Sequence, residues 1–454
     1  MTMALISSII QNAKSRVSIS STNVSSYFQK RICLTPRVGV IRPMSVSTVN
    51  TKADDRKEAI VIVGAGIAGL ASAVSLQRFG IRSVVLEQAE SLRTEGSSIT
   101  LSKNGWKALD AIGIGDEIRS QFLEIQGIVI KSDDGKELNA FGFKDEDKSQ
   151  ELRVVERRVL LETLASKLPP DAISFSSKLA KIETSENGSN NLLQLEDGNR
   201  LSAEVVIACD GVWSPTARWM GFREPKYAGH IAFRGLGYFP EGQPYEPKVN
   251  YTYGRGLRAG YVPASKTKVY WFVMCNSSSP GPRITDPSIL RQQAKELVRD
   301  WPVADMLTLI NCTADDTLTR NPLYDRWLWP LISPPPSIGR TVLVGDAWHP
   351  MTPNMGQGAC CALEDSIVLT EKLAEAMKSK HISVEDAFKT YGSERWRRVF
   401  PLTVMANRVG ALLQSENKLI CSVRNNIIVP KLIKPRTLTR HANYEFEQTK
   451  RDRH

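Results

Sequence analysis

Three glycines and one acid near the start of the chain have the types and spacing of a dinucleotide site. Gly64, Gly66 and Gly69 follow directly on the apolar run 59–63, and Glu87 closes a second apolar run 18 residues beyond Gly69. In such a unit the first glycine makes the tight turn, the second lets backbone amides approach a pyrophosphate, and the third permits close packing of helix on strand. Glu87 stands where an acid would accept from a ribose hydroxyl pair. The spacing predicts a nucleotide-binding strand, turn and helix.

Two further acids follow apolar runs that are typical of buried parallel strands. Asp210 comes after the run 205–208, and Asp346 comes after the run 341–344. Open α/β sheets bind their ligands at the carboxyl ends of such strands. The glycines after the second acid leave space for a flat ring, and amides at the next helix start would stabilise the negative charge of a reduced flavin. The residues expected to contact this cofactor are Asp210, Gly211, Gly345, Asp346, Gly356 and Gly358.

With these motifs the chain resembles the FAD-dependent aromatic-hydroxylase monooxygenases, in particular the plant branch similar to salicylate hydroxylase and zeaxanthin epoxidase. The resemblance covers nearly all of residues 58–410. It implies that the glycine fingerprint binds the ADP part of FAD and that Asp210-Gly211 serves both FAD and NAD(P)H. It also implies that Gly345-Asp346 binds the ribityl and pyrophosphate region of FAD.

The same resemblance marks side chains outside these motifs. Arg157 falls where the family has a cofactor-contacting arginine at a helix start, with a solvated pair of charges, Arg157 and Arg158, as the alternative. Pro353 falls in the family's proline position beside the flavin, and with the loop 356–358 it is the candidate for the lining that excludes water. His349 lies beside the flavin motif, Gly345-Asp346, where it either packs against the motif or acts as a catalytic acid or base.

The expected fold is α/β: a Rossmann-like FAD-binding domain with an inserted, mostly antiparallel β-sheet substrate domain, as in the aromatic-hydroxylase fold. Residues 54–225 and 326–410 would form the discontinuous FAD-binding domain. Residues 226–325 include stretches that alternate apolar and polar side chains, as strands do, and would form the substrate domain. Residues 411–454 would form a C-terminal helical tail, whose apolar stripe packs on the domain or makes weak contact with a membrane surface. No run of 18 apolar residues predicts a transmembrane helix.

The first 53 residues have the composition of an organellar transit peptide. They contain no Asp or Glu, seven basic residues and ten serines. Such a Ser-rich, acid-poor stretch is typical of transit peptides, and its apolar start favours the chloroplast over the mitochondrion. Without it, 52 bases face 48 acids, so the formal net charge falls from +11 to about +4 and gives no argument for nucleic-acid binding.

Cysteine and histidine usage argues for a reducing compartment and against a metal site. The seven cysteines form no regular framework, and the five histidines lack ligand spacing.

The sequence has one complete nucleotide fingerprint and no second Rossmann unit that would bind NAD(P)H stably. The resemblance implies that NADPH or NADH docks transiently, reduces FAD and leaves. A flavin C4a-hydroperoxide would then transfer one oxygen atom from O2 to an aromatic or unsaturated small molecule. The alternatives are a flavin-fold reductase or cyclase without oxygen insertion, and a non-enzymatic binding protein that keeps the nucleotide fold.

The substrate candidates lie on the inserted sheet, where ordinary sheet packing is the alternative. A basic residue in the pocket would favour an anionic aromatic substrate, and an apolar channel would favour a terpenoid. The candidate residues are Arg234, Tyr251, Tyr253 and Trp271.

Overall fold

The computed structural model describes residues 56–92, 98–185, 190–302 and 304–446. The predicted transit peptide, residues 1–53, lies outside the described residues. So does the end of the predicted C-terminal tail, residues 447–454.

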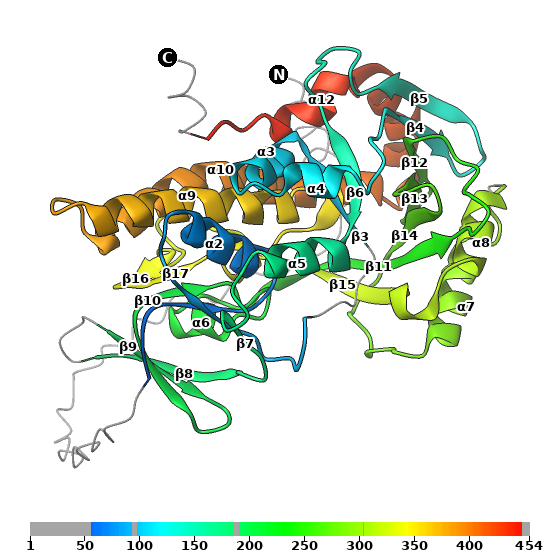
Figure 1. The fold of residues 1–454 in the computed structure, drawn as a ribbon. Coiled ribbons are helices and arrows are strands. Elements are labelled where there is room, and N and C mark those ends of the chain that lie inside the picture. Colours follow the sequence, from blue (N-terminus) through cyan, green and yellow to red (C-terminus); the bar gives the residue numbers. More distant parts are fainter. Residues whose placement is uncertain (1–55, 93–97, 186–189, 303, 447–454) are drawn as a thin grey trace, which may run out of the picture. The chain divides into compact units, whose positions relative to one another are not determined.

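A mainly parallel sheet carries the nucleotide motifs (Figure 1). β1 (Arg56–Val63) pairs in parallel with β10 (Arg200–Ala208) on one side and with β2 (Val84–Leu86) on the other, and β10 pairs in parallel with β17 (Thr341–Leu343). The carboxyl-terminal halves of β1 and β10 are buried apolar runs, as in parallel strands that are covered on both faces. The other strands of this sheet are β7 (Ile173–Ser174), β8 (Leu179–Thr184), β9 (Asn191–Leu195) and β16 (Ser337–Ile338).

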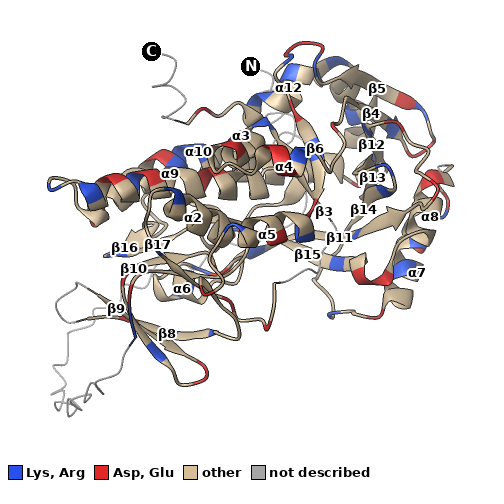
Figure 2. Cartoon of the chain, in the orientation of Figure 1, with Lys and Arg blue, Asp and Glu red and all other residues tan. Residues whose placement is uncertain are grey.

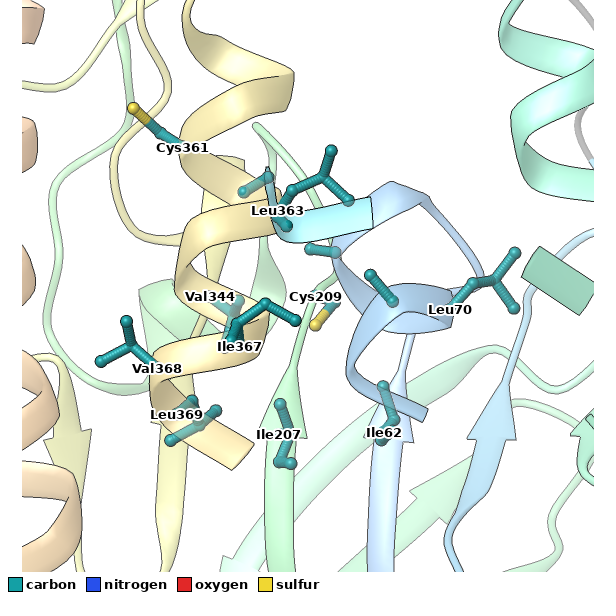
Figure 3. Close-up of a cluster of buried hydrophobic side chains, with 14 of the residues drawn as sticks. Ile62, Leu70, Ile207, Cys209, Val344, Cys361, Leu363, Ile367, Val368 and Leu369 are labelled. Carbon is teal, nitrogen blue, oxygen red and sulfur yellow. The ribbon is translucent and has the colours of Figure 1, made fainter. Parts of the chain in front are cut away.

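Alternate residues of β1 enter two different cores. Ile62 packs with helices α2 (Ile67–Arg78) and α9 (Gly358–Lys378), which Figures 1 and 3 show on the same face of the sheet. Val61 and Val63 point the other way and pack with the β8–β9 hairpin. Because both faces are covered, every residue in the last half of β1 must be apolar.

The second sheet is mostly antiparallel, in the order β15-β11-β14-β13-β12-β4-β5. Its side chains alternate between two cores, so that Phe272 lies in one and Trp271 in the other. Helices α7 (Pro287–Val298) and α8 (Ala304–Asn311) cover the face that contains Trp271. The strands are β4 (Gly127–Ser132), β5 (Glu137–Gly142), β11 (Lys226–Tyr238), β12 (Lys248–Tyr253), β13 (Leu257–Pro263), β14 (Lys268–Asn276) and β15 (Thr319–Asp325).

Two segments depart from the predicted domain boundaries. Residues 127–142, which the prediction places in the FAD-binding domain, form β4 and β5 of the second sheet, with β4 parallel to β12. The alternating pattern of such a strand fits either sheet, so only the long-range pairing decides where it lies. The predicted boundary at residue 410 falls inside α10 (Val384–Leu413), whose last residue packs in the core of the second sheet.

The C-terminal segment packs on the second sheet. It comprises α11 (Lys418–Val423), a π-helical segment (Arg424–Leu432) and α12 (Pro435–Thr439). Val429 is buried, and the side-chain amide of Asn139 donates to the carbonyl oxygens of Val429 and Ile433, each at 2.8 Å. Part of the C-terminal segment therefore serves packing, and membrane contact through its apolar stripe stays a prediction. Among the helices of the described ranges, none is both long and apolar enough to cross a bilayer.

Candidate active site

The carboxyl ends of four strands form one row across the parallel sheet. Val63 lies opposite Leu86 and Ala208, and Ala208 lies opposite Leu343. The chain leaves each strand at this row, so motifs from four separate stretches of sequence start from one edge of the sheet. Gly64 and Glu87 come directly after this row, Asp210 comes two residues after it, and Asp346 comes three residues after it.

The three fingerprint glycines meet three different steric requirements. Gly64 has φ +102°, which L side chains rarely adopt. A Cβ on Gly69 would lie 1.9 Å from the carbonyl oxygen of Gly64, so only glycine lets α2 pack this close to the turn. A Cβ on Gly66 would meet nothing within 4 Å, although this residue is the N-cap of α2. The protein itself therefore does not need a glycine at Gly66, whereas a phosphate at the helix N-terminus would.

Glu87 is buried at the end of β2. Its carboxylate accepts from the backbone N–H of Ala65 at 2.9 Å and from that of Ala89 at 3.0 Å. The acid thus fixes the fingerprint loop against the second strand. Its predicted contact with a ribose stays a prediction.

Asp346 reaches solvent but is surrounded by protein atoms. Its side chain is exposed, yet desolvation by surrounding protein atoms raises its pKa, and the charges of His349 and Arg157 only partly oppose this shift. Arg157 begins α5 (Arg157–Ser166), whereas the neighbouring Arg158 is exposed and pairs with Glu162 at 2.8 Å. The charge of Arg157 therefore acts on Asp346, whereas Arg158 pairs at the surface, and the cofactor contact of Arg157 stays a prediction.

Asp210 is held by one carboxylate oxygen only. Its Oδ2 accepts from the backbone N–H of Thr216 at 3.2 Å, while its buried Oδ1 has no hydrogen-bond partner among the described residues. Burial raises the pKa of this carboxyl group. The adjacent Gly211 has φ +81°, and a Cβ there would meet nothing within 4 Å. An unfilled acceptor beside open backbone is what a ligand hydroxyl or amide would need.

The flavin loop predicted around Pro353 is a short 3-10 turn, η3 (Pro353–Met355), that leads into α9. Gly356 follows it with φ +62°, and a Cβ there would meet nothing within 4 Å. At Gly358 the nearest atom to a Cβ would be 3.9 Å away, on Met351. Gln357 makes no side-chain cap at the start of the helix, so this residue leaves the first amides of α9 uncapped.

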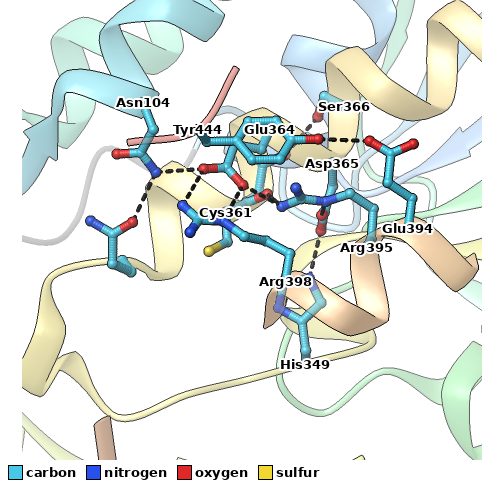
Figure 4. Close-up of polar contacts among 12 residues, drawn as sticks. Asn104, His349, Cys361, Glu364, Asp365, Ser366, Glu394, Arg395, Arg398 and Tyr444 are labelled. Carbon is cyan, nitrogen blue, oxygen red and sulfur yellow. Dashed lines mark hydrogen bonds and ion pairs between the residues drawn. The ribbon is translucent and has the colours of Figure 1, made fainter. Parts of the chain in front are cut away.

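A buried network of charges on α9 and α10 holds the residues near this loop in place (Figure 4). Asp365 accepts from the Gly345 backbone N–H at 3.0 Å and from Arg395 Nε at 2.6 Å. Glu364 accepts from Arg395 Nη2 at 2.6 Å and from Arg398 Nη2 at 2.8 Å. Figure 2 shows acidic and basic residues interspersed along α9 and α10, and on the buried side of the two helices they pair with one another.

The charges of this network hold one another ionised. Burial of Glu364 opposes ionisation, but the charges of Arg395 and Arg398 outweigh it and lower the pKa of this carboxyl group. The pKa of Asp365 is lowered in the same way, against burial, by the charges of His349 and Arg395. The network is therefore a set of satisfied ions that links α9 and α10 to the flavin motif.

His349 belongs to this network. It is fully buried, and its Nε2 lies 2.5 Å from Asp365 Oδ2. Its Nδ1 is buried without a hydrogen-bond partner among the described residues. This geometry agrees with the packing role, because the ring is fixed by a carboxylate that also holds the backbone of the motif. A role as acid or base would have to use Nδ1.

Arg326 is a site residue that the sequence motifs do not reveal. It is buried, and its Nη1 donates to the carbonyl oxygens of Ala347 at 2.7 Å and Trp348 at 3.2 Å. Desolvation lowers its pKa, and the charges of Asp210, Glu224 and Asp346 oppose this shift. Arg326 therefore holds the backbone after Asp346 and places a positive charge near both acids of the flavin motifs.

The four predicted substrate residues separate onto two faces of the second sheet. Arg234 lies opposite Phe272 in the register of β11 and β14, and Tyr251 stacks on Tyr253 with ring centroids 6.0 Å apart, all on the face that contains Phe272. Trp271 is fully buried on the opposite face, under α7 and α8, where its Nε1 donates to Thr313 Oγ1 at 2.7 Å. The alternation of β14 explains the separation. Trp271 is a core residue and does not join the other three.

Arg258 of β13 is a second site residue that sequence reasoning missed. It is only 4% exposed, and its Nη2 donates to Met274 Sδ at 2.9 Å and to Asn354 Oδ1 of the flavin loop. Its Nε has no hydrogen-bond partner, and no carboxylate pairs with it, among the described residues. Desolvation lowers its pKa, partly opposed by Tyr253 and Tyr251. A lone arginine within an apolar strand was the available signal in the sequence.

The residues at this edge fit FAD. Open backbone at Gly66 suits a pyrophosphate at the start of α2, and the solvent-facing carboxylate of Asp346 suits a cofactor hydroxyl. The unfilled Oδ1 of Asp210 and the open backbone at Gly356 lie on the segments where the flavin motifs were predicted.

Comparisons with known proteins agree with this geometry. A family model described as a FAD binding domain matches residues 57–403. Monooxygenase 2 of Arabidopsis thaliana is 36% identical over 382 residues, which cover 81% of this chain and 93% of that protein. Monooxygenase 1 of the same plant is 30% identical over 401 residues, which cover 85% and 98%. The chain therefore belongs to the family of FAD-binding monooxygenases.

The fold agrees with solved structures of the same class. The crystal structure of Klebsiella pneumoniae HpxO complexed with FAD and uric acid superposes with a TM-score of 0.74 at 23% sequence identity, covering 86% of this chain and 96% of that chain. This likeness confirms the predicted fold, a Rossmann-like domain with an inserted sheet. Together with the family match, it confirms the prediction of a FAD-dependent monooxygenase as the class of enzyme.

Proposed function

We propose that this chain uses NADPH or NADH to insert one oxygen atom from O2 into a planar, anionic aromatic molecule. FAD, when bound, supplies the oxygen chemistry. The observation that carries the substrate class is Arg258, a buried arginine with a lowered pKa that faces the flavin loop and has only neutral partners among the described residues. A substrate carboxylate or phenolate would give this cation the partner that the protein does not supply.

The surroundings of Arg258 suit a flat ring. Tyr251 and Tyr253 form a stacked pair on the same face, and the Arg258 guanidinium lies 5.9 Å from the centre of the Phe272 ring. Arg234 adds a second basic residue to this face. The aromatic rings would exclude water and hold the substrate ring, while the arginine fixes its charged end.

Protein residues also account for cofactor positioning. The Asp365 network holds Gly345 and His349, and Arg326 holds the backbone that follows Asp346. Asp210 keeps one carboxylate oxygen free of protein partners among the described residues, which supports its predicted second role toward NAD(P)H. Each of these groups would orient the cofactor or place a charge beside it. Pro353 and the loop 356–358 would line the flavin ring.

The test is substrate-dependent NAD(P)H consumption by the purified holoenzyme, with 18O2 to follow the oxygen atom. Aromatic acids are compared with their methyl esters. The acid should be the better substrate, and Arg258→Met should raise its KM roughly 10- to 150-fold, the equivalent of about 1.5–3 kcal/mol for a charged hydrogen bond, without changing that of the ester. Arg255→Met, at an exposed arginine three positions away, is the matched control. Equal use of acid and ester by the wild type contradicts the anionic substrate, and lack of 18O in the product contradicts oxygen insertion.

We further propose that the enzyme acts in the chloroplast. Three zeaxanthin epoxidases that are named chloroplastic match this chain at 26–29% identity, and the acid-free, serine-rich first 53 residues have a transit-peptide composition. A reporter fused to residues 1–55 should enter plastids. Its retention in the cytosol would contradict this location.

A further inference from the structure

An uncharged segment of 13 residues, 327–339, joins β15 to β17 through the short edge strand β16. Its tip carries large apolar side chains that face solvent. Trp329 is 48% exposed, Ile332 is 75% exposed, and Leu331 is as exposed as it would be in an isolated peptide, at 106%. Single exposed apolar residues are ordinary, but three within four positions, without a charge among them, form a patch.

The base of this tip is firmly held. Leu328 is buried, and its carbonyl oxygen accepts from Trp396 Nε1 of α10 at 2.9 Å. The Trp329 ring packs edge-on against Phe400, with centroids 5.6 Å apart. The Trp329 carbonyl oxygen closes the turn by accepting from the backbone N–H of Ser333 at 3.0 Å. The apolar side chains are therefore presented by an ordered turn.

The backbone of the tip is strained. Leu331 has φ +64°, in the left-handed region that is uncommon for a residue other than glycine. Such strain persists only where the surrounding structure imposes it. Here it points an aliphatic side chain into solvent.

Basic residues flank the tip on both of its anchors. Arg223 is exposed, and its carbonyl oxygen accepts from Arg326 at 3.1 Å, while exposed Lys226 lies opposite Asp325 in the sheet. On the other side, exposed Arg397 follows Trp396 on α10. The nearby acids are already paired: Glu224 with Arg218 at 2.7 Å, and Glu385 with Arg340 at 2.9 Å.

We propose that residues 329–332 form a membrane-surface anchor that inserts into the headgroup region of an anionic lipid bilayer. An aromatic residue at the base and aliphatic residues at the tip match the polarity gradient of a bilayer interface. The flanking cations would contact anionic headgroups. A short apolar tip suits insertion into lipid, whereas a stable protein interface takes about 20–30 residues from each partner. The anchor is separate from the residues assigned to flavin and substrate.

The experiment uses full-length holoenzyme and phosphatidylcholine vesicles, with or without phosphatidylglycerol. Brominated acyl chains quench tryptophan only at short range, so the quenching that is lost in Trp329→Phe reports on this tip alone. We expect wild-type fluorescence to be quenched by vesicles containing phosphatidylglycerol, and the Trp329→Phe variant to be quenched measurably less. Equal quenching of the two proteins overturns the proposal, as does absence of quenching in the wild type.

A second variant tests the aliphatic tip. The double variant Leu331→Asp, Ile332→Asp should lower the affinity for vesicles, measured by the Trp329-dependent quenching, about tenfold or more. The reason is that two aliphatic side chains are lost from the interface with lipid. Aspartate tolerates the left-handed backbone of Leu331, and FAD content and circular dichroism check folding. Leu419→Asp, at a residue 73% exposed on α11, is the matched control and should bind vesicles as the wild type does. Loss of binding in the control alone would assign the contact to the C-terminal tail. If the wild type dimerises without lipid and the tip variant does not, the tip is an interface between two copies.

Discussion

Two sets of charges lie at the flavin motifs, and their pKa values move in opposite directions. Glu364 and Asp365 have lowered pKa values, and the pKa of Arg395 is raised, because each ion faces its opposite. Arg258 has a lowered pKa and Asp346 a raised one, because surrounding protein atoms desolvate each charge without supplying an equivalent partner. The first set is stabilised as ions by the protein, whereas the second is destabilised as ions.

The difference separates scaffold from ligand site. A buried ion pair that satisfies itself leaves nothing for a ligand, so its function is to fix the elements that carry it. A desolvated charge that the protein leaves short of partners raises the free energy of the site, and a ligand of opposite charge or complementary hydrogen bonding recovers that cost. Asp210, with its unfilled Oδ1, belongs with Arg258 and Asp346.

The largest effect on stability is expected when one ion is removed from the buried, mutually paired set. Arg395→Met leaves Glu364 and Asp365 buried with too few cations, and should lower the free energy of unfolding by about 3–5 kcal/mol in urea denaturation. Arg397→Met, at the exposed neighbour on the same helix, should change it by no more than about 0.5 kcal/mol. A loss under about 1 kcal/mol in Arg395→Met would mean that the network does not support the fold.

The same variant has a pH signature. Carboxylates whose folded pKa is lowered contribute stability above their unfolded pKa of about 4, and lose it as the pH falls through the folded value. The stability difference between wild type and Arg395→Met should therefore shrink below about pH 4.

A smaller effect, on FAD binding and reduction, is expected when the acids that the protein leaves short of partners, Asp346 and Asp210, are replaced. Asp346→Ala should weaken FAD affinity by roughly 5- to 150-fold, the equivalent of about 1–3 kcal/mol for an unpaired cofactor hydroxyl, as measured by fluorescence titration. Asp210→Ala should slow flavin reduction by NAD(P)H more than Asp346→Ala does, in stopped-flow experiments at matched FAD occupancy. Equal reduction rates would show that Asp210 serves FAD alone.

The smallest effect on stability is expected at Arg258. Arg258→Met replaces a desolvated cation that has no ion-pair partner among the described residues, so the free energy of unfolding without substrate should stay within about 1 kcal/mol of the wild type or rise. A loss as large as that of Arg395→Met would show that this arginine belongs to the scaffold, and would remove the argument for an anionic substrate.

Local sequence was sufficient for the fold class and for placing the predicted flavin motifs after parallel strands. Gly64 and Gly69 carry steric requirements that only glycine meets, and Gly66 leaves the backbone open for a ligand. The apolar runs before Asp210 and Asp346 are typical of buried parallel strands, and they pair as such. These features are short-range, so spacing alone reveals them. The class of enzyme followed from the three motifs together.

Side-chain partnership was decided by the tertiary structure. Trp271 and Phe272 are neighbours in sequence, yet the pleat of β14 sends them into different cores. Arg258 and Arg395 are equally ordinary arginines in the sequence, and only the fold gives one of them two carboxylates and the other a thioether and an amide. Sequence determines which groups can carry charge, but the energy of a buried charge depends on what the rest of the chain places around it.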